Sequence, residues 1–269
     1  MEKVEANLLR DCNFIRSIIL RNGLTEIGEK AFYGCSNLEI VVIPETVTKI
    51  GLFAFAYSGL KSIILPHGLT EIGEKAFYSC NKLESVVIPE TVTKIDPRAF
   101  AGSGLKSINL PDGLTEIGES ACHGCHNLEI VVIPETVTKI GLFAFAYSGL
   151  KSIILPHGLT EIGEKAFHMC RNLENITIPE TVTKIGPSAF AFSRLKSITL
   201  LDGRLTEIGE EAFFNCFYLK TIVIPETVTK IGPNAFAFSR LESITLPHGV
   251  EIGKGAFYNC HDLVVNHRN

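Results

Sequence analysis

The stretch NLEIVVIPETVTKIGLFAFAYSGLKSIILPHGLTEIGEKAF, residues 37 to 77, returns letter for letter at residues 127 to 167, ninety positions later. It holds two versions of one shorter unit, which begin at Leu38 and Leu60. The first reads Leu-x-x-Val-x-Ile-Pro-x-x-Val-x-x-Ile-Gly-x-x-Ala-Phe, and the second differs by having Ile63, Leu65 and Leu69 at three of these apolar positions. Units of 22 and 23 residues alternate along the chain, which is typical of a solenoid repeat.

The number of units can be counted from the recurring Ala-Phe pair. It occurs eleven times, once with Cys in place of Phe, at Phe32, Phe55, Phe77, Phe100, Cys122, Phe145, Phe167, Phe190, Phe213, Phe236 and Phe257. A unit this short cannot bury its own apolar side chains, so the copies must stack. The alternating Leu-x-x-Val-x-Ile segment predicts one strand per unit, the following Pro ends it, and the later Gly is expected to permit a sharp corner.

This pattern, with a Cys three residues after the Phe of every second unit, resembles the BspA-type leucine-rich repeat of bacterial and protist surface proteins, from about Ile15 to Leu263. The resemblance implies a leucine-rich repeat solenoid, here of about eleven coils. It would be curved, with a parallel β-sheet on the concave face and short turns or helical segments on the convex side. We expect residues 1–14 to form an N-terminal cap or partial coil, 15–263 a single solenoid, and 264–269 a C-terminal tail. The family is often associated with adhesion, and the resemblance implies no catalytic residues.

The pentapeptide CHGCH at residues 122 to 126 has the spacing that attaches haem, and its side chains could also hold a metal. However, neighbouring units read FYGCS and FYSCN at this place, so Cys125 belongs to a recurring column and Cys122 replaces a core Phe. We favour buried structural thiols, with haem or a fortuitous metal site as the alternatives. The column comprises Cys35, Cys80, Cys125, Cys170, Cys216 and Cys260. Its members would lie roughly 10 Å apart, too far for disulfides, so we expect free thiols.

Composition limits the function further. Of 269 residues, 46% are hydrophobic and 20% charged, with a net charge of −4, which predicts a folded protein. There is no basic stripe for nucleic acid, and no apolar run of the length of a membrane-spanning helix. Lys and Glu alternate between successive units, as in Glu39, Lys61, Glu84 and Lys106, which we interpret as a device that fixes register. The alternation fails only at Lys196 and Lys220, a candidate anion-binding spot.

Strand residues between the core positions must point out of the sheet. They carry no charge and would form a strip roughly 50 Å long over eleven strands, larger than the apolar surface that monomers usually expose. The candidate binding strip consists of Ile40, Val42, Ile64, Val87, Asn109, Ile130, Val132, Ile154, Thr177 and Thr199. The alternative is that these residues simply favour strands. The pairs Leu52-Phe53 and Leu142-Phe143 replace polar turn residues and would either project as apolar knobs or fold over the core.

These features predict a non-enzymatic protein-interaction or adhesion module, without cofactor or metal, that binds a protein or glycan partner on its concave sheet. The adhesion role is what the resemblance to the family implies. The chain is expected to be a monomer that neither enters membranes nor binds nucleic acid. The alternative is a cytosolic leucine-rich repeat scaffold. The chain begins without a secretory signal, yet a buried cysteine column is compatible with either side of the membrane, so the localisation stays open.

Overall fold

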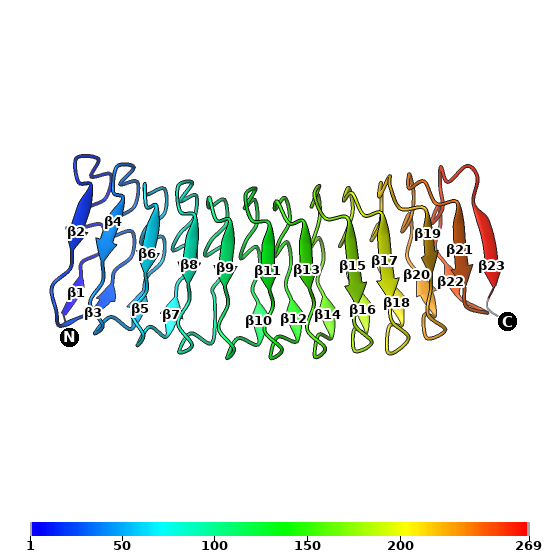
Figure 1. The fold of residues 1–269 in the computed structure, drawn as a ribbon, viewed down its shortest axis with the longest axis horizontal. Helices are drawn as coiled ribbons and strands as arrows, with labels where there is room; N and C mark the ends of the chain where they lie inside the picture. The colour runs from blue at the N-terminus through cyan, green and yellow to red at the C-terminus, as the bar shows by residue number, and fades with distance from the viewer. Residues whose placement is uncertain (1, 268–269) are drawn as a thin grey trace.

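The computed structural model describes residues 2–267 as a parallel β-solenoid of about twelve turns, stacked in one elongated row (Figure 1). The described residues contain strands and turns and no helix, so the helical segments that we allowed for on the convex side are not formed. Correspondingly, none of residues 2–267 belongs to a helix that could cross a membrane. Each turn of the solenoid contributes to two rows of parallel strands, here called the main ladder and the second ladder.

The main ladder is built from the segments predicted as strands, with the core residues inward. Its strands are β2 (Ser17–Ile19), β4 (Ile40–Val42), β6 (Ser62–Ile64), β8 (Ser85–Val87), β9 (Ser107–Asn109), β11 (Ile130–Val132), β13 (Ser152–Ile154), β15 (Asn175–Ile178), β17 (Ser197–Leu200), β19 (Thr221–Val223), β21 (Ser243–Leu246) and β23 (Val264–His267). They are hydrogen-bonded in four groups that follow one another along the stack. β15 and β21 end directly before a Pro, which has no N–H to continue the pairing.

The second ladder was not predicted. Its strands are β1 (Glu2–Val4), β3 (Leu24–Ile27), β5 (Lys49–Ile50), β7 (Glu71–Ile72), β10 (Glu116–Ile117), β12 (Lys139–Ile140), β14 (Glu161–Ile162), β16 (Lys184–Ile185), β18 (Glu207–Ile208), β20 (Lys230–Ile231) and β22 (Glu251–Ile252). Here Lys and Glu face each other in register, as Lys49 does with Glu26 and Glu71. These strands therefore carry a column of alternating charges of their own. The ladder is interrupted after β7, where only an isolated bridge joins Ile72 to Ile95.

Both ends of the chain add to the stack. In the segment expected to be a cap, β1 pairs with β3, and the Leu9 N–H donates to the Ala31 carbonyl at 2.9 Å. In the segment expected to be a tail, β23 pairs with β21. These strands bring the count from the eleven coils predicted to about twelve turns. Residues 1, 268 and 269 lie outside the described residues.

The interior is organised around the Phe column. Successive rings stack nearly parallel, with centroids 5.1 Å apart for Phe32 and Phe55 and 5.4 Å for Phe55 and Phe77. The stack is interrupted between Phe100 and Phe145, where the buried Cys122 takes the position. This burial continues from coil to coil, so the apolar residues form one continuous core.

The glycine of the Ile-Gly pair has a different role from the one predicted. None of these glycines has a positive φ; instead they let two coils approach closely. A Cβ on Gly51 would lie 2.9 Å from the Ile27 carbonyl oxygen, and one on Gly163 would lie 2.7 Å from that of Ile140. The one coil with another residue at this position has Asp96, and it is there that the second ladder is reduced to a bridge. The Asp96 N–H donates to the Ile72 carbonyl at 3.2 Å, compared with 2.8 Å from Gly73 to Ile50, as expected where a Cβ stands between the coils.

The sharp bends occur later, in the turn around the Ala-Phe pair, and largely without glycine. Two positions per turn adopt positive φ, for example Phe53 at 54° and Tyr57 at 59°. Alternate residues donate hydrogen bonds to the next coil, as the Phe55 N–H does to the Ala76 carbonyl at 2.8 Å. These inter-coil bonds stabilise a left-handed backbone that non-glycine residues otherwise avoid.

Candidate functional site

The ten residues of the candidate binding strip are all exposed on the main ladder between β4 and β17. Ile64, Val87, Asn109, Val132 and Ile154 face one another in strict register across five hydrogen-bonded strands. The most exposed of its apolar side chains are Ile64, at 84%, and Ile154, at 74%. Ile40 and Ile130 lie in the neighbouring column, two residues before Val42 and Val132. The structure thus leaves large apolar side chains of the strip uncovered on one face of the main ladder.

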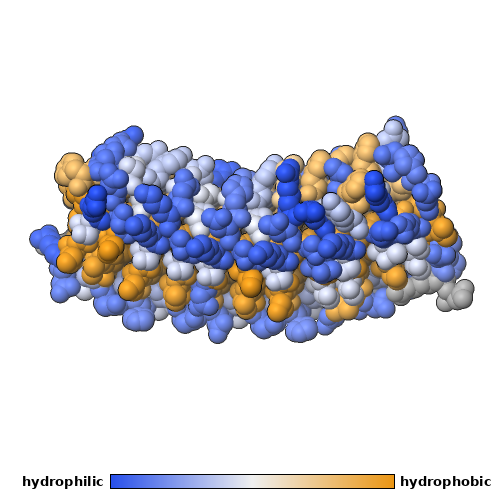
Figure 2. Space-filling model, turned by 45° about the horizontal axis from the view of Figure 1, so that its top comes forward, coloured by the Kyte–Doolittle hydropathy of each residue, from blue (hydrophilic) through white to orange (hydrophobic). Residues whose placement is uncertain are grey.

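The strip is apolar mainly over the first half of the solenoid. Figure 2 shows an orange band along the lower part of this face, densest toward the N-terminal end, with a blue band of charged residues beside it. The exposed Ile19 on β2 prolongs the row at one end. Toward the C-terminal end its character becomes polar, with Thr177 and Thr199.

Two hollows lie on the strip. One, of about 300 Å³, is bordered by Ile40, Val42 and Ile64. The other, of about 360 Å³, is bordered by Ile154, Thr177 and Thr199, together with His157. Neither hollow could be predicted from the sequence, because both depend on the side-chain conformations of neighbouring strand residues. The first is lined by apolar side chains together with Glu45 and Ser62. The second has hydroxyl and imidazole groups in its lining.

The charged band beside the strip consists of ion pairs between neighbouring coils. The ammonium of Lys61 lies 2.9 Å from the Glu39 carboxylate, and that contact lowers the pKa of Glu39. Lys196 and Lys220, the predicted anion-binding spot, each have an acidic partner: Lys196 lies 2.7 Å from Glu174 and Lys220 2.6 Å from Glu242. Because both ammonium groups are already paired, this spot offers no free positive charge.

The pentapeptide CHGCH brings its two thiols into contact: the Cys122 thiol donates a hydrogen bond to Cys125, which raises the pKa of Cys122 and lowers that of Cys125. Cys122 and Cys125 are buried and unbridged, His123 is half-buried in the turn, and His126 is exposed. The Cys125 thiol donates to the Phe100 carbonyl at 3.2 Å and contacts the Ser103 hydroxyl at 3.4 Å. Among residues 2–267, no three His, Cys, Asp or Glu side chains are grouped as metal ligands would be.

The cysteine column includes buried serines as well, which the sequence pattern had not indicated. Five of its six thiols contact a buried serine of the preceding coil, as Cys80 does Ser58 and Cys170 does Ser148, both at 3.4 Å. The sixth, Cys35, donates to the Leu9 carbonyl at 2.9 Å. Burial raises the pKa of Cys80, Cys170 and Cys216 to about 12. These thiols are therefore protonated packing groups and not nucleophiles.

The two Leu-Phe pairs are half-buried, an outcome between the two that we considered. The Phe53 ring packs edge-on against Tyr33 with centroids 6.2 Å apart, and the Lys75 ammonium lies 4.9 Å from its centre. Phe143 has corresponding contacts with His123 and Lys165. They lie in the turns, so they do not extend the strip.

Comparison with known proteins gives a consistent result. The model of the BspA type leucine rich repeat region matches residues 2–129 and 138–264. A leucine-rich repeat protein from Bacteroides ovatus is similar over 97% of this chain and 74% of its own, with 30% identity and a TM-score of 0.81. A leucine rich cell surface protein from Faecalibacterium prausnitzii is 28% identical over 98% of this chain and 76% of its own, with a TM-score of 0.61.

The pneumococcal vaccine antigen PcpA shares the fold, with 20% identity over 94% of this chain and 69% of its own and a TM-score of 0.58. No curated protein matches. The repeat pattern, the stacked coils and the family match agree over almost the whole length. The chain belongs to the BspA-type leucine-rich repeat family.

Proposed function

We propose that this chain is a non-enzymatic interaction module that binds a protein or glycan partner through the candidate binding strip. Leucine-rich repeat proteins are in general protein-interaction modules. The observation that carries the proposal is the row of uncharged, exposed side chains on the main ladder, with Ile64, Val87, Val132 and Ile154 all more than half uncovered. A contiguous apolar surface of this kind favours burial against a partner.

The distribution of reactive groups supports a binding role over catalysis. The acidic and basic side chains of the charged band beside the strip are exposed, and they form ion pairs that recur from coil to coil. Catalytic groups usually gather at one place and have pKa values adapted to proton transfer. Here, burial raises the pKa of the Cys80, Cys170 and Cys216 thiols to about 12, so these groups stay protonated.

We further propose that the module acts in adhesion at a cell surface, as a monomer. The Faecalibacterium prausnitzii relative, 28% identical, is described as a cell surface protein. The rival role, an intracellular scaffold, would use the same strip. The unbridged cysteines do not decide between these roles, because seven of the eight are buried and packed inside the solenoid.

The strip can be tested with charges at its centre. Val87→Lys combined with Val132→Glu introduces two ions on strands that flank Asn109, while the inward residues of those strands stay unchanged. The purified chain would be immobilised to capture partners from extracts and from intact cells, and the captured partner would then be purified for affinity measurements. We expect the double variant to weaken that affinity at least tenfold with little change in melting temperature.

A matched control uses the same two coils. Thr93→Lys combined with Thr138→Glu places the same charges at exposed positions beside the second ladder. We expect this variant to bind as the unmodified chain does. If the control pair weakens binding and the strip pair leaves it unchanged, the strip is not the binding surface.

A further inference from the structure

A second aromatic ladder runs along the turns, outside the stacked Phe column. Its rings pack edge-on or tilted with centroids 5.3 to 5.5 Å apart, as Tyr33 does with Tyr57, Tyr57 with Tyr78, and His168 with Phe192. In successive coils the ring belongs alternately to the residue directly after the core Phe, as Tyr33 after Phe32, and to the second residue after it, as Tyr57 after Phe55. This ladder is half-buried and forms part of the outer surface of the turns.

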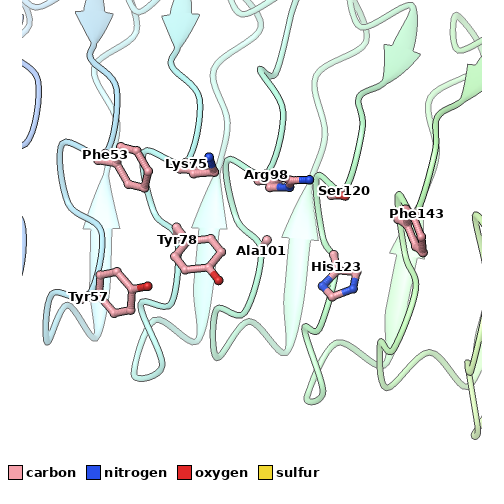
Figure 3. A pocket seen from close by; sticks show the side chains of 9 residues that line it. All are labelled: Phe53, Tyr57, Lys75, Tyr78, Arg98, Ala101, Ser120, His123 and Phe143. Carbon is pink, nitrogen blue, oxygen red and sulfur yellow. The ribbon is translucent and has the colours of Figure 1, made fainter.

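The aromatic ladder has one interruption within the described turns from Tyr33 to Tyr258, between Tyr78 and His123. The coil between them carries Gly102 at the position that Tyr57, Tyr147, Phe192 and Phe238 occupy in the equivalent coils. Figure 3 shows Tyr78 and His123 on either side of Ala101, with no ring between them. We call this feature the Gly102 gap.

The backbone at the Gly102 gap is the same as in the coils that carry a ring. Gly102 has a φ of 68°, compared with 59° for Tyr57 and 60° for Phe192. Its N–H donates to the His123 carbonyl at 2.7 Å, as the Tyr57 N–H does to Tyr78 at 2.8 Å. Only the side chain is missing. The gap is two ring-to-ring steps wide, about 11 Å, which leaves room for one ring in contact with both neighbours.

A cavity of about 410 Å³ lies at this position, lined among others by Tyr78, Ala101, His123, Phe53 and Phe143. The charged groups of its lining are two cations, and each has an acidic partner outside the lining: Arg98 lies 3.1 Å from Glu119, and Lys75 lies 2.8 Å from Glu74. Burial, with a smaller contribution from Arg98, lowers the pKa of His123, which favours the neutral imidazole. The cavity therefore offers ring faces and edges beside two paired cations, which suits the face of an uncharged aromatic ring.

The chain contains a filled version of the same site. Ninety residues later, Phe192 lies between His168 and Phe214, with centroid distances of 5.5 and 5.4 Å. The turns before it repeat those before the gap, since Phe143 and Tyr147 correspond to Phe53 and Tyr57. Phe192 thus indicates the size, orientation and chemistry of the group that fits the Gly102 gap.

We propose that the Gly102 gap binds one Tyr or Phe side chain of a partner protein, which completes the aromatic ladder from outside. The side chain enters between Tyr78 and His123 and packs on both, as Phe192 packs within its own coil. This site lies in the turns, and its lining includes no residue of the main ladder. It is a second contact surface, independent of the strip proposed above.

The test uses the blocked tripeptide Gly-Tyr-Gly, with Gly-Leu-Gly as the apolar control, titrated against the isotopically labelled chain. We expect dissociation in the millimolar range for a single ring, with chemical-shift changes confined to Gly102, His123 and Tyr78. Binding of Gly-Leu-Gly with equal affinity and the same shifts would overturn the proposal. Binding of free p-cresol without binding of the tyrosine peptide would also overturn it. The site would then bind small aromatic molecules and not an aromatic side chain of a protein.

Two variants give the matched comparison. Gly102→Phe closes the gap with a residue that the same backbone already carries at Phe192, and it should reduce tyrosine-peptide affinity at least tenfold while the melting temperature is kept or raised. Phe192→Gly should open a second gap and raise the number of bound peptides from one to two. Unchanged binding by a folded Gly102→Phe variant refutes the site. The strip variant Val87→Lys with Val132→Glu should bind the peptide normally, which separates this proposal from the proposed strip.

Discussion

The rings of Phe77 and Phe100 lie 5.2 Å apart with their planes only 3° from parallel, and both are fully buried. Removing one of them leaves its neighbour without a contact on that face and opens a cavity that rigid coils cannot close. Phe100→Ala should therefore lower the free energy of unfolding by about 3 to 5 kcal/mol. Urea denaturation followed by circular dichroism measures this; a loss below 1 kcal/mol would mean that the column contributes little.

Cys122→Phe should have the opposite effect. The substitution restores the one missing ring between Phe100 and Phe145, whose neighbours elsewhere stack at 5.1 to 5.8 Å. Two new aromatic contacts should stabilise the chain by about 1 to 3 kcal/mol, visible as a higher melting temperature. Cys122→Ala, which restores no ring, is the control. A lower melting temperature for Cys122→Phe would mean that the coil has repacked around the sulfur.

Stability should fall at alkaline pH. The thiols of Cys80, Cys170 and Cys216 have pKa values of about 12 in the folded chain, raised from 9.0 by burial. Above about pH 9 the unfolded chain loses protons that the folded chain retains, so the free energy of unfolding decreases as the pH rises toward 12. The decrease is at most about 1.4 kcal/mol per pH unit for each thiol.

The comparison for this effect is the triple variant Cys80→Ala, Cys170→Ala and Cys216→Ala. Its stability at pH 8 should be lower, but its decline between pH 9 and 11 should be distinctly shallower. Urea midpoints at a series of pH values provide the measurement. Parallel declines in the two proteins would assign the pH dependence to other groups.

Two glycines near each other in the chain should respond differently to alanine. A Cβ at Gly73 would lie 2.8 Å from the Ile50 carbonyl oxygen, whereas one at Gly68 would meet its nearest atom at 3.5 Å. Gly73→Ala should cost about 2 to 3 kcal/mol. Gly68→Ala should change stability by less than about 1 kcal/mol, in the stabilising direction. Thermal denaturation compares the two, and equal effects would contradict the close approach of the coils.

The repeat allowed much of this structure to be predicted, because a position that recurs in every unit has the same neighbours in every coil. The Phe column, the strands from Ile40 to Thr199 and the exposure of Ile64 and Val87 were accessible in this way. The second ladder was missed because strands of two residues, such as Lys49–Ile50, carry no alternating pattern. A cap or partial coil was expected at residues 1–14, whereas the strand β23 was missed because its sequence departs from the repeat.

The Gly102 gap was missed for a different reason. The aromatic ladder alternates between two positions after the core residue, as in Tyr78 and Tyr57, so no single column of the aligned units contains it. Its existence depends on side-chain directions that are set by positive φ angles at residues such as Tyr57 and Phe192. The residue types do not indicate positive φ angles, because these angles are stabilised by hydrogen bonds to the next coil.

The interruptions at Asp96, Gly102 and Cys122 fall in two neighbouring coils, where the second ladder, the aromatic ladder and the Phe column all lose a member. In a stack whose coils contact only their neighbours, the energy of each interface determines how far cooperativity extends. The main ladder still joins β8, β9 and β11 across this region. The two halves stay joined by the main ladder, and the lost contacts make this region the place where we expect one half to begin to melt before the other. A core that is continuous in space is thus expected to divide thermodynamically at these coils.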